Sequence, residues 1–267
     1  MQVTGMANAY GWCNNITGTP ACGDNVVNMS GAYIGCYNLT GSPVCGRNVT
    51  NMAKAYYNCQ KLTGSAACGD NVINMSSAYS NCRGLTGSPA CGANVTNMDN
   101  TFSSCINLTG SPVCGDKVTD MTTTYFNCSN LTGSPVCGNN VTTMVSTYMQ
   151  CQNLTGPAVC GENVTLMVST YYRCRNLASN AYFYSSSVSS AVECFYDRDN
   201  SKRLNLYVPA NSLTLNTCLL GTSSTSLVGK TTTWTNDIAN SCYYNTKHNI
   251  YIYPVANVAA ARAANGD

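Results

Sequence analysis

The sequence predicts an α/β repeat fold in which short coils stack on one another as a solenoid. Cysteine recurs every 23 residues without insertion or deletion, at Cys13, Cys36, Cys59, Cys82, Cys105, Cys128, Cys151 and Cys174. A fixed period of this length is typical of units that bury their apolar side only by stacking on the next unit. Three later cysteines keep a looser rhythm, spaced by 24 residues, at Cys194, Cys218 and Cys242.

Five positions of each unit, counted from its first cysteine, carry a repeated apolar residue. In the unit that begins at Cys36, positions 4, 9, 14, 17 and 21 are Leu39, Val44, Val49, Met52 and Tyr56. Positions 14, 17 and 21 follow one face of a helical turn, and positions 4 to 9 predict a short strand that ends in a glycine-containing bend. Stacked copies give a narrow parallel sheet on one side and short helices on the other, with coils roughly 4.8 Å apart.

The chain divides into a regular and an irregular part. Residues 1–177 hold a half unit (1–12) and seven complete units (13–173), and residues 178–267 hold degenerate repeats and an irregular C-terminal cap. Terminal units of a stack are atypical because one side meets water, so this tail is either a cap or a docking module. Within it we expect strands at 182–184, 204–208 and 250–253, and helices near 210–218, over 234–244 and over 255–264.

The unit resembles the leucine-rich repeats of the bacterial BspA type, in their 23-residue Treponema-like class. Leu39, Val44, Tyr56 and Cys59 match the pattern of that family, and Ala55 matches its small residue before the aromatic. Position 7 departs from it, with Thr or Ser in place of an aliphatic residue, and position 10 is Cys in place of Pro. The resemblance implies a leucine-rich-repeat solenoid over residues 1–177. It also implies a bacterial surface adhesin or a phage tail or fibre component.

The composition excludes several classes of partner. Charged residues make up 9% of the chain and the net charge is +2, with no basic run. Nucleic acid binding needs clustered Lys and Arg, so we expect no nucleic acid partner. The apolar runs are too short to cross a bilayer, so we expect no membrane insertion. Abundant Asn, Ser and Thr predict an uncharged, hydrogen-bonding surface that suits carbohydrate or packing in an assembly.

The cysteines form two columns, at positions 1 and 10. Within one unit these positions stand ~20 Å or more apart along extended chain, beyond the ~7 Å that a disulfide allows between Cα atoms. Neighbours in one column are close enough to bond, but the seven members of the second column cannot all pair. We favour buried thiols that act as small hydrophobic residues. The chain has no C-x-x-C pair, and we predict no metal site and no cofactor.

The sequence also argues against an enzyme. The one histidine, His248, stands in the tail and is expected to be a surface hydrogen-bonding residue. The acidic residues Asp24, Asp70, Asp116 and Glu162 share position 12 with Arg47, Ala93 and Asn139, which indicates a solvated loop. No triad, P-loop or dinucleotide-binding glycine pattern occurs. We therefore predict no catalytic residues.

Two kinds of surface are expected to contact a partner. If Ser42 and Val44 point inward, alternation places Gly41 and Pro43 outward, either as a tight bend or as a flat face for close approach of a protein or glycan. Variation between units concentrates at the edges of the repeat. The bulkier edge residues are the candidate contacts: Tyr37, Arg47, Tyr57, Lys61, Arg83, Phe126, Tyr172 and Arg173.

These patterns predict a recognition or adhesion protein that binds a host protein or a glycan on a cell surface. The alternative is a structural filament or virion decoration protein without a ligand. Residues 1–12 show no signal-peptide pattern and begin in mid-repeat. Three explanations are open: a fragment, a processed product, or a first turn that stacks on another subunit. We expect an extracellular location, on a virion or on the surface of a bacterium.

Overall fold

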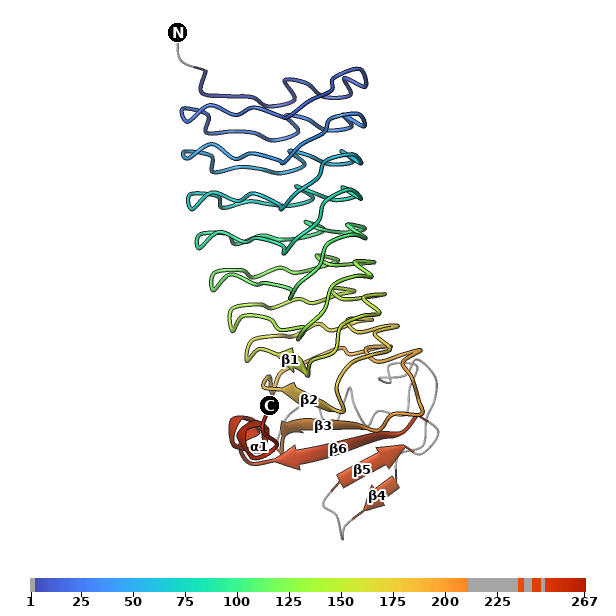
Figure 1. The fold of residues 1–267 in the computed structure, drawn as a ribbon. Helices are drawn as coiled ribbons and strands as arrows, with labels where there is room; N and C mark the ends of the chain where they lie inside the picture. Colours follow the sequence, from blue (N-terminus) through green and yellow to red (C-terminus); the bar gives the residue numbers. More distant parts are fainter. Residues whose placement is uncertain (1–2, 211–234, 238–241, 246–247) are drawn as a thin grey trace.

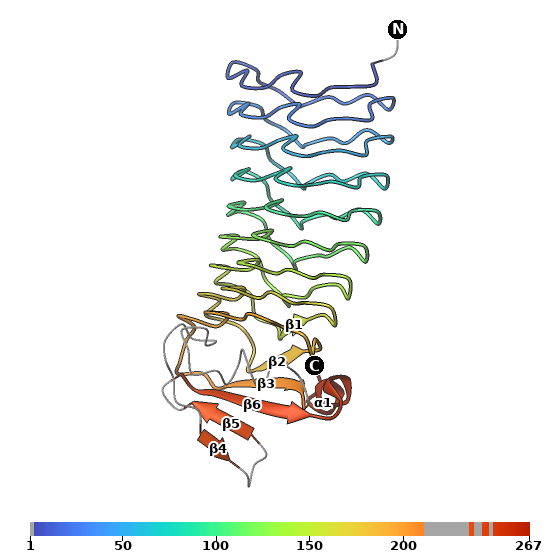
Figure 2. The same cartoon turned by 180° about the vertical axis from the view of Figure 1, so that it is seen from behind.

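The computed structural model describes residues 3–210, 235–237, 242–245 and 248–267 of the 267-residue chain. Flat coils lie one above another from the N-terminal end, and a sheet with one helix closes the other end (Figures 1 and 2). Within the described residues, four strands of this sheet run parallel and only one α-helix occurs. This agrees with the predicted α/β repeat fold at the level of its sheet and overall class.

The segment predicted as a short helix is a run of overlapping turns instead. The Met52 N–H donates to the Asn74 carbonyl of the next coil (2.9 Å), whereas the Ala55 N–H donates to the Met52 carbonyl three residues earlier (2.9 Å). Lys54 and Asn58 have positive φ, at 56° and 64°. In an α-helix each N–H beyond the first turn donates to the carbonyl four residues earlier. Here alternate N–H groups bond the next coil, so the helix prediction for the units is wrong.

The predicted strand at positions 4 to 9 is also wrong for most units. Gly41 and Gly64, at position 6, have φ of 78° and 74°, which interrupts an extended backbone. One bond crosses between coils here, from the Thr63 N–H to the Gly41 carbonyl (2.9 Å). Only the last unit forms a strand, β1 (Ala158–Cys160). Elsewhere the coils join through single parallel bridges at position 16, at Gly5, Asn28, Asn51, Asn74, Asn97, Asp120, Thr143, Leu166 and Ser190.

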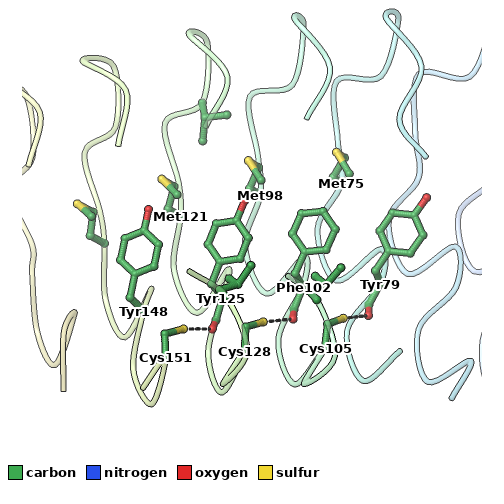
Figure 3. Close-up of a cluster of buried hydrophobic side chains, with 14 of the residues drawn as sticks. Met75, Tyr79, Met98, Phe102, Cys105, Met121, Tyr125, Cys128, Tyr148 and Cys151 are labelled. Carbon is green, nitrogen blue, oxygen red and sulfur yellow. Dashed lines mark hydrogen bonds between the residues drawn. The ribbon is translucent and has the colours of Figure 1, made fainter. Parts of the chain in front are cut away.

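The predicted stacking of like side chains is confirmed for the aromatic column at position 21. Its rings lie nearly parallel, with centroids 5.1 to 5.7 Å apart and interplanar angles of 2° to 12°. Figure 3 shows methionine and cysteine columns running beside it. Leu39, Leu62 and Leu85 are likewise buried, as are the valines of position 14 from Val26 to Val164. These columns form one continuous core.

The tyrosine hydroxyls define two opposite walls in each coil. The Tyr56 hydroxyl donates to the Val44 carbonyl (2.7 Å) and accepts from the Val44 N–H (3.2 Å), so position 21 faces position 9 across the core. We call positions 4–10 the front wall and positions 14–21 the back wall. Positions 11–13 and positions 22 to 3 of the next unit form the two ends of the coil. Phe102 lacks the hydroxyl that makes this bond.

The position-1 cysteines from Cys36 onward are buried and hydrogen-bonded, whereas Cys13 is exposed. Their thiols donate to the position-21 carbonyl of the preceding coil, as from Cys105 to Tyr79 (3.0 Å) and from Cys151 to Tyr125 (2.9 Å; Figure 3). Burial raises the pKa of both thiols to about 12. The cysteines of the described part, from Cys13 to Cys194, are free thiols. The sequence identified them as core residues but did not indicate the bond that each makes.

The terminal sheet has the strand order β1-β2-β3-β6-β5-β4. Strands β2 (Asn180–Phe183), β3 (Leu204–Pro209) and β6 (Ile250–Val255) extend β1 in parallel. Strands β5 (Cys242–Asn245) and β4 (Thr235–Asp237) add antiparallel pairs at the far edge. The strands expected at 204–208 and 250–253 are confirmed, and the one expected at 182–184 begins two residues earlier.

The helix α1 (Val258–Ala264) follows the last strand, as expected, but begins later because Pro254 and Val255 belong to β6. Asn257 caps it by accepting from the Ala260 N–H (2.9 Å), and Val258 packs against the sheet. The helix expected over 234–244 is wrong, because β4 and β5 occupy its described residues. The helix expected near 210–218 lies outside the described residues, apart from Ala210.

Candidate functional site

The eight predicted contact residues do not form one patch. They divide between the two ends of the coils. Positions 22 and 23 of one unit and positions 2 and 3 of the next lie at one end, and position 12 lies at the other. Seven lie at the first of these ends: Tyr37, Tyr57, Lys61, Arg83, Phe126, Tyr172 and Arg173. Arg47 lies at the opposite end. A single ligand therefore cannot contact all eight.

The charged candidates already bond neighbouring side chains. Lys61 Nζ donates to Asn38 Oδ1 (2.7 Å), and Arg83 Nε donates to Asn81 Oδ1 (2.8 Å). Arg173 pairs with Asp197 (2.7 Å), and this interaction lowers the pKa of the Asp197 carboxyl. Arg47 forms an exposed pair with Asp24 (3.3 Å). The aromatic candidates Tyr37, Tyr57, Phe126 and Tyr172 are only half-buried.

Asparagine columns connect the coils at both ends. At position 13, Asn71 Nδ2 donates to the Arg47 carbonyl of the preceding coil (3.0 Å). At position 3, Asn107 Nδ2 donates in the same way to the Arg83 carbonyl (2.8 Å). The same bonds repeat from Asn38, Asn94, Asn140, Asn163 and Asn176. The ends are thus held by their own amides, which is a structural role.

An open groove of about 630 Å³ runs beside position 13. Its lining repeats along the stack: Val27, Asn48, Thr50, Asn71, Ile73, Asn94, Thr96 and Lys117. Its threonine hydroxyls already form hydrogen bonds within the chain. The Thr96 hydroxyl, for example, donates to the Ile73 carbonyl (3.3 Å). Lys117 Nζ likewise donates to Asn94 Oδ1 (2.7 Å). Most polar groups of this groove therefore bond within the chain.

Of the two interpretations of Gly41 and Pro43, the flat outward face is wrong, whereas the positive φ of Gly41 agrees with a bend. Pro43 and Pro89, at position 8, are buried, whereas Ser42 and Ser88, at position 7, are exposed. The reason is the positive φ at position 6, as at Gly41, because it breaks the simple alternation of an extended strand. The front wall therefore turns its prolines to the core and its hydroxyl side chains to the solvent.

These hydroxyl side chains make two exposed columns, which together we call the hydroxyl face. Position 5 contributes Thr17, Thr40, Thr63, Thr86, Thr109, Thr132 and Thr155, all exposed. Position 7 contributes Thr19, Ser42, Ser65, Ser88, Ser111 and Ser134, of which only the last is half-buried. Thr132 makes one long bond to the Gly110 carbonyl (3.5 Å). The other hydroxyls of the face have no hydrogen-bond partner in the described part of the chain.

The glycines between the two columns hold the face in place. Gly87 has φ of 75°, and a Cβ added to it would lie 2.5 Å from the Ser65 hydroxyl of the preceding coil. Gly41 is similar, with φ of 78° and a Cβ position 2.5 Å from the Thr19 hydroxyl. Each position-7 hydroxyl thus lies in the space that a side chain at the next glycine would fill. No side chain separates the two columns.

Within the hydroxyl face, position 5 does not vary from unit to unit, whereas position 7 is Thr19, serine in five units and Pro157 in the last. Other exposed positions do vary: position 12 alone carries Asp, Arg, Ala, Asn and Glu. Position 5 is Thr in all seven units, although among the described residues only the Thr132 hydroxyl of this column makes a hydrogen bond. Sequence reasoning missed this face because it looked for variable residues, yet the unbroken Thr-Gly of every unit was visible.

Other chemistry was sought across the described residues. His248 lies beside β6, where its N–H donates to Asn245 Oδ1 (3.1 Å) and its carbonyl accepts from Arg198 (3.0 Å). In the parts that the structure describes, no three His, Cys, Asp or Glu side chains are placed to share a metal ion. The same parts contain no helix with the length and apolar character to cross a membrane. Comparisons with protein-family models, curated proteins and solved structures found no match to this chain.

Proposed function

We propose that this chain is a non-enzymatic leucine-rich-repeat solenoid of the BspA type that acts in recognition or adhesion. It works outside the cell, on a bacterial surface or as a phage tail or fibre component, and binds a host protein or a glycan. The repeat pattern supports the family, and the stacked columns of apolar side chains support the solenoid. The chemistry of the surface supports the function.

The unvarying threonine column of the hydroxyl face, at position 5, is the observation that carries this proposal. An exposed residue that folding does not require is free to vary, as position 12 does. Thr86 and its copies have not varied, and apart from Thr132 their hydroxyls have no hydrogen-bond partner in the described part of the chain. Contact with something outside the chain explains both facts.

Binding to whole cells tests the proposal. The fluorescently labelled chain is incubated with panels of bacterial and animal cells, and bound fluorescence is measured by flow cytometry. The variant Thr63→Val/Thr86→Val/Thr109→Val removes three hydroxyls of the face but keeps the shape of the side chains. The matched control is Thr96→Val/Thr119→Val/Thr142→Val, whose hydroxyls donate to carbonyls of the preceding coil. We expect binding that the first variant loses and the control retains.

A ligand-free structural role is the second candidate, and the N-terminal end of the stack favours it. Val3, Tyr10 and Trp12 are exposed there, and a hollow of about 440 Å³ lies between the first coil and the next. Stacking of another subunit would cover these side chains. Sedimentation velocity over a range of concentrations separates the candidates. Assembly that Trp12→Gln abolishes, together with no binding to any cell, would favour the structural role.

A further inference from the structure

We propose that the hydroxyl face binds an extended, uncharged β-1,4-linked polysaccharide that lies along the stack, with about one sugar residue per coil. This inference rests on the proposed function and names its ligand class. It begins from the charge of the face. Positions 5 to 7 contain no charged residue in any of the seven units. An ionic ligand would gain no ion pair there, so a neutral ligand is favoured.

The hydrogen-bonding groups of the face favour a sugar over a peptide. Each hydroxyl is both donor and acceptor, as are the hydroxyls of a sugar. A peptide that adds to a sheet edge needs free backbone groups. On this wall the position-5 N–H and the position-6 carbonyl already bond between coils, as from Thr86 to Gly64 (2.9 Å) and from Thr109 to Gly87 (2.9 Å). In five units position 8 is proline, which has no N–H to donate to an added strand. What the front wall offers is side-chain hydroxyls.

The spacing of the face selects an extended polymer. Neighbouring coils of a parallel stack lie about 4.8 Å apart, so seven coils present hydroxyls over about 29 Å along the axis. That coil spacing is close to the length of one extended pyranose residue. A straight β-1,4-linked chain can therefore place one sugar residue at each coil. Because successive sugars are turned over in such a chain, the same contacts recur at every second coil. A helical α-linked chain leaves the face after a few residues.

The affinity should grow with ligand length, because each coil adds similar bonds. One neutral hydrogen bond contributes about 0.5–1.5 kcal/mol, so a single sugar binds weakly. Sugars joined in one chain bind in the same orientation, and each added residue acts at a high effective concentration. The glycines of the face support this, because the hydroxyls they hold need little reordering on binding.

The test is isothermal titration calorimetry with cello-oligosaccharides of two to six glucose residues, and with maltohexaose as the α-linked control. We expect the affinity to rise with every added glucose and maltohexaose to bind at least about tenfold more weakly than cellohexaose. Thr63→Val/Thr86→Val/Thr109→Val should weaken cellohexaose binding by about tenfold or more, whereas Thr96→Val/Thr119→Val/Thr142→Val should leave it unchanged. Circular dichroism melting shows that each variant is folded.

Several results overturn the inference. No binding of cellohexaose does so, as does a plateau at the trisaccharide or equal binding of maltohexaose. If the face variant abolishes cell binding while no cello-oligosaccharide binds, the ligand class is wrong and the proposed function survives. If nothing binds to cells either, both fail. If the chain instead dimerises in solution and the face variant makes it monomeric, the occupant of the face is a second copy.

Discussion

The coils and the terminal sheet follow almost the same period, yet they pair their backbones differently. In the unit that begins at Cys105, Pro112 stands at position 8 and Gly110 has φ of 77°. In the last unit Ala158 replaces that proline, Gly156 is no longer at positive φ, and β1 begins. Proline cannot donate to a ladder, and a positive φ breaks extension. The positive φ at position 6 distinguishes the irregular coil better than the proline does, because the unit that begins at Cys59 has Ala66 at position 8, yet Gly64 keeps a φ of 74° and the unit forms no strand.

The comparison shows what each arrangement exposes. The sheet residues Ala158, Val159 and Cys160 are buried on both faces. In the coils, the corresponding wall keeps its core residues inside but leaves hydroxyls at positions 5 and 7 in solvent. The irregular backbone is therefore what creates the hydroxyl face, and the regular sheet ends it.

The largest expected effect is the loss of coil stability at alkaline pH. Burial raises the pKa of Cys59, Cys105 and Cys151 to about 12 from an ordinary value of 9, so the unfolded chain loses these protons first. The contribution of these protonated thiols to the free energy of unfolding is fully present below pH 9 and is lost as pH rises toward 12. Each such thiol removes about 1.4 kcal/mol of stability per pH unit in this window. Urea unfolding midpoints from pH 7 to 11 measure the effect.

Hydrogen exchange shows whether the coils open before the sheet at high pH, as the many thiols of the coils predict. Cys105→Ala serves as the control, because it removes one titrating group and should make the fall with pH less steep. A midpoint that stays constant up to pH 11 would contradict the burial of these thiols.

The next effect in size comes from the leucine column. Leu85 is fully buried between neighbouring coils, so Leu85→Ala should cost about 2–5 kcal/mol through lost burial and a cavity. The conservative change Leu85→Met should cost under about 1.5 kcal/mol. Urea denaturation measures both. Ile252→Ala in β6 is the matching substitution in the sheet. If either substitution lowers amide protection against hydrogen exchange equally in the coils and in the sheet, unit-by-unit stacking is contradicted.

Much of this architecture could be predicted from the sequence. The unbroken period indicated the register, so the columns of Leu39, Tyr56 and Cys59 were expected to lie inside, and they do. The absence of helices from the units was not predictable from spacing alone. Val49, Met52 and Tyr56 follow helical spacing, but hydrogen bonds between coils compete with those inside a helix, and positive φ at Lys54 makes the first kind possible.

The candidate site was predicted less well, for a related reason. The direction of Ser42 and Pro43 depends on the φ of Gly41, which no periodicity reveals. Variable residues such as Lys61 and Arg83 looked like contacts, but their side chains bond asparagines of the chain. A position that repeats without variation was taken as structural, although for Thr86 no partner in the described chain supports that.

A glycine substitution in the coils should have an intermediate effect. Gly87→Ala forces alanine to positive φ and places its Cβ against the Ser65 hydroxyl, so we expect a loss of about 1–3 kcal/mol. Adding Ser65→Ala removes the hydroxyl that the new Cβ would meet, so it should restore the part of the lost stability that this contact causes. Gly23→Ala is the control, because φ there is ordinary and no atom lies within 4 Å of the added Cβ. Thermal unfolding with two-state analysis compares the variants, and equal losses at the two glycines would refute this account.

The smallest expected effect is that of adding a hydroxyl to a buried phenylalanine, and we expect the change in stability to have opposite signs in the coils and at the sheet. Phe102 is the coil aromatic without a hydroxyl, and Phe102→Tyr supplies one opposite the Ala90 backbone, so it should stabilise by about 0.5–1.5 kcal/mol. Phe195 stacks at the end of the same column, but the residue twelve positions earlier is Phe183 of β2, whose backbone pairs with β1 and whose ring lies against that of Phe195 (centroids 6.0 Å apart). Phe195→Tyr would bury an unpaired hydroxyl and should destabilise by about 1–3 kcal/mol.

The tyrosine column already shows this trend. The hydroxyls of Tyr33, Tyr56 and Tyr125 lie 2.6 to 2.7 Å from the carbonyls opposite, whereas that of Tyr171 lies 3.4 Å from the Val159 carbonyl in β1. A backbone that joins the sheet thus has less to offer a hydroxyl across the core. Urea denaturation of the two variants decides the matter: opposite signs support the distinction, and stabilisation by both would show that the sheet backbone still accepts such a bond.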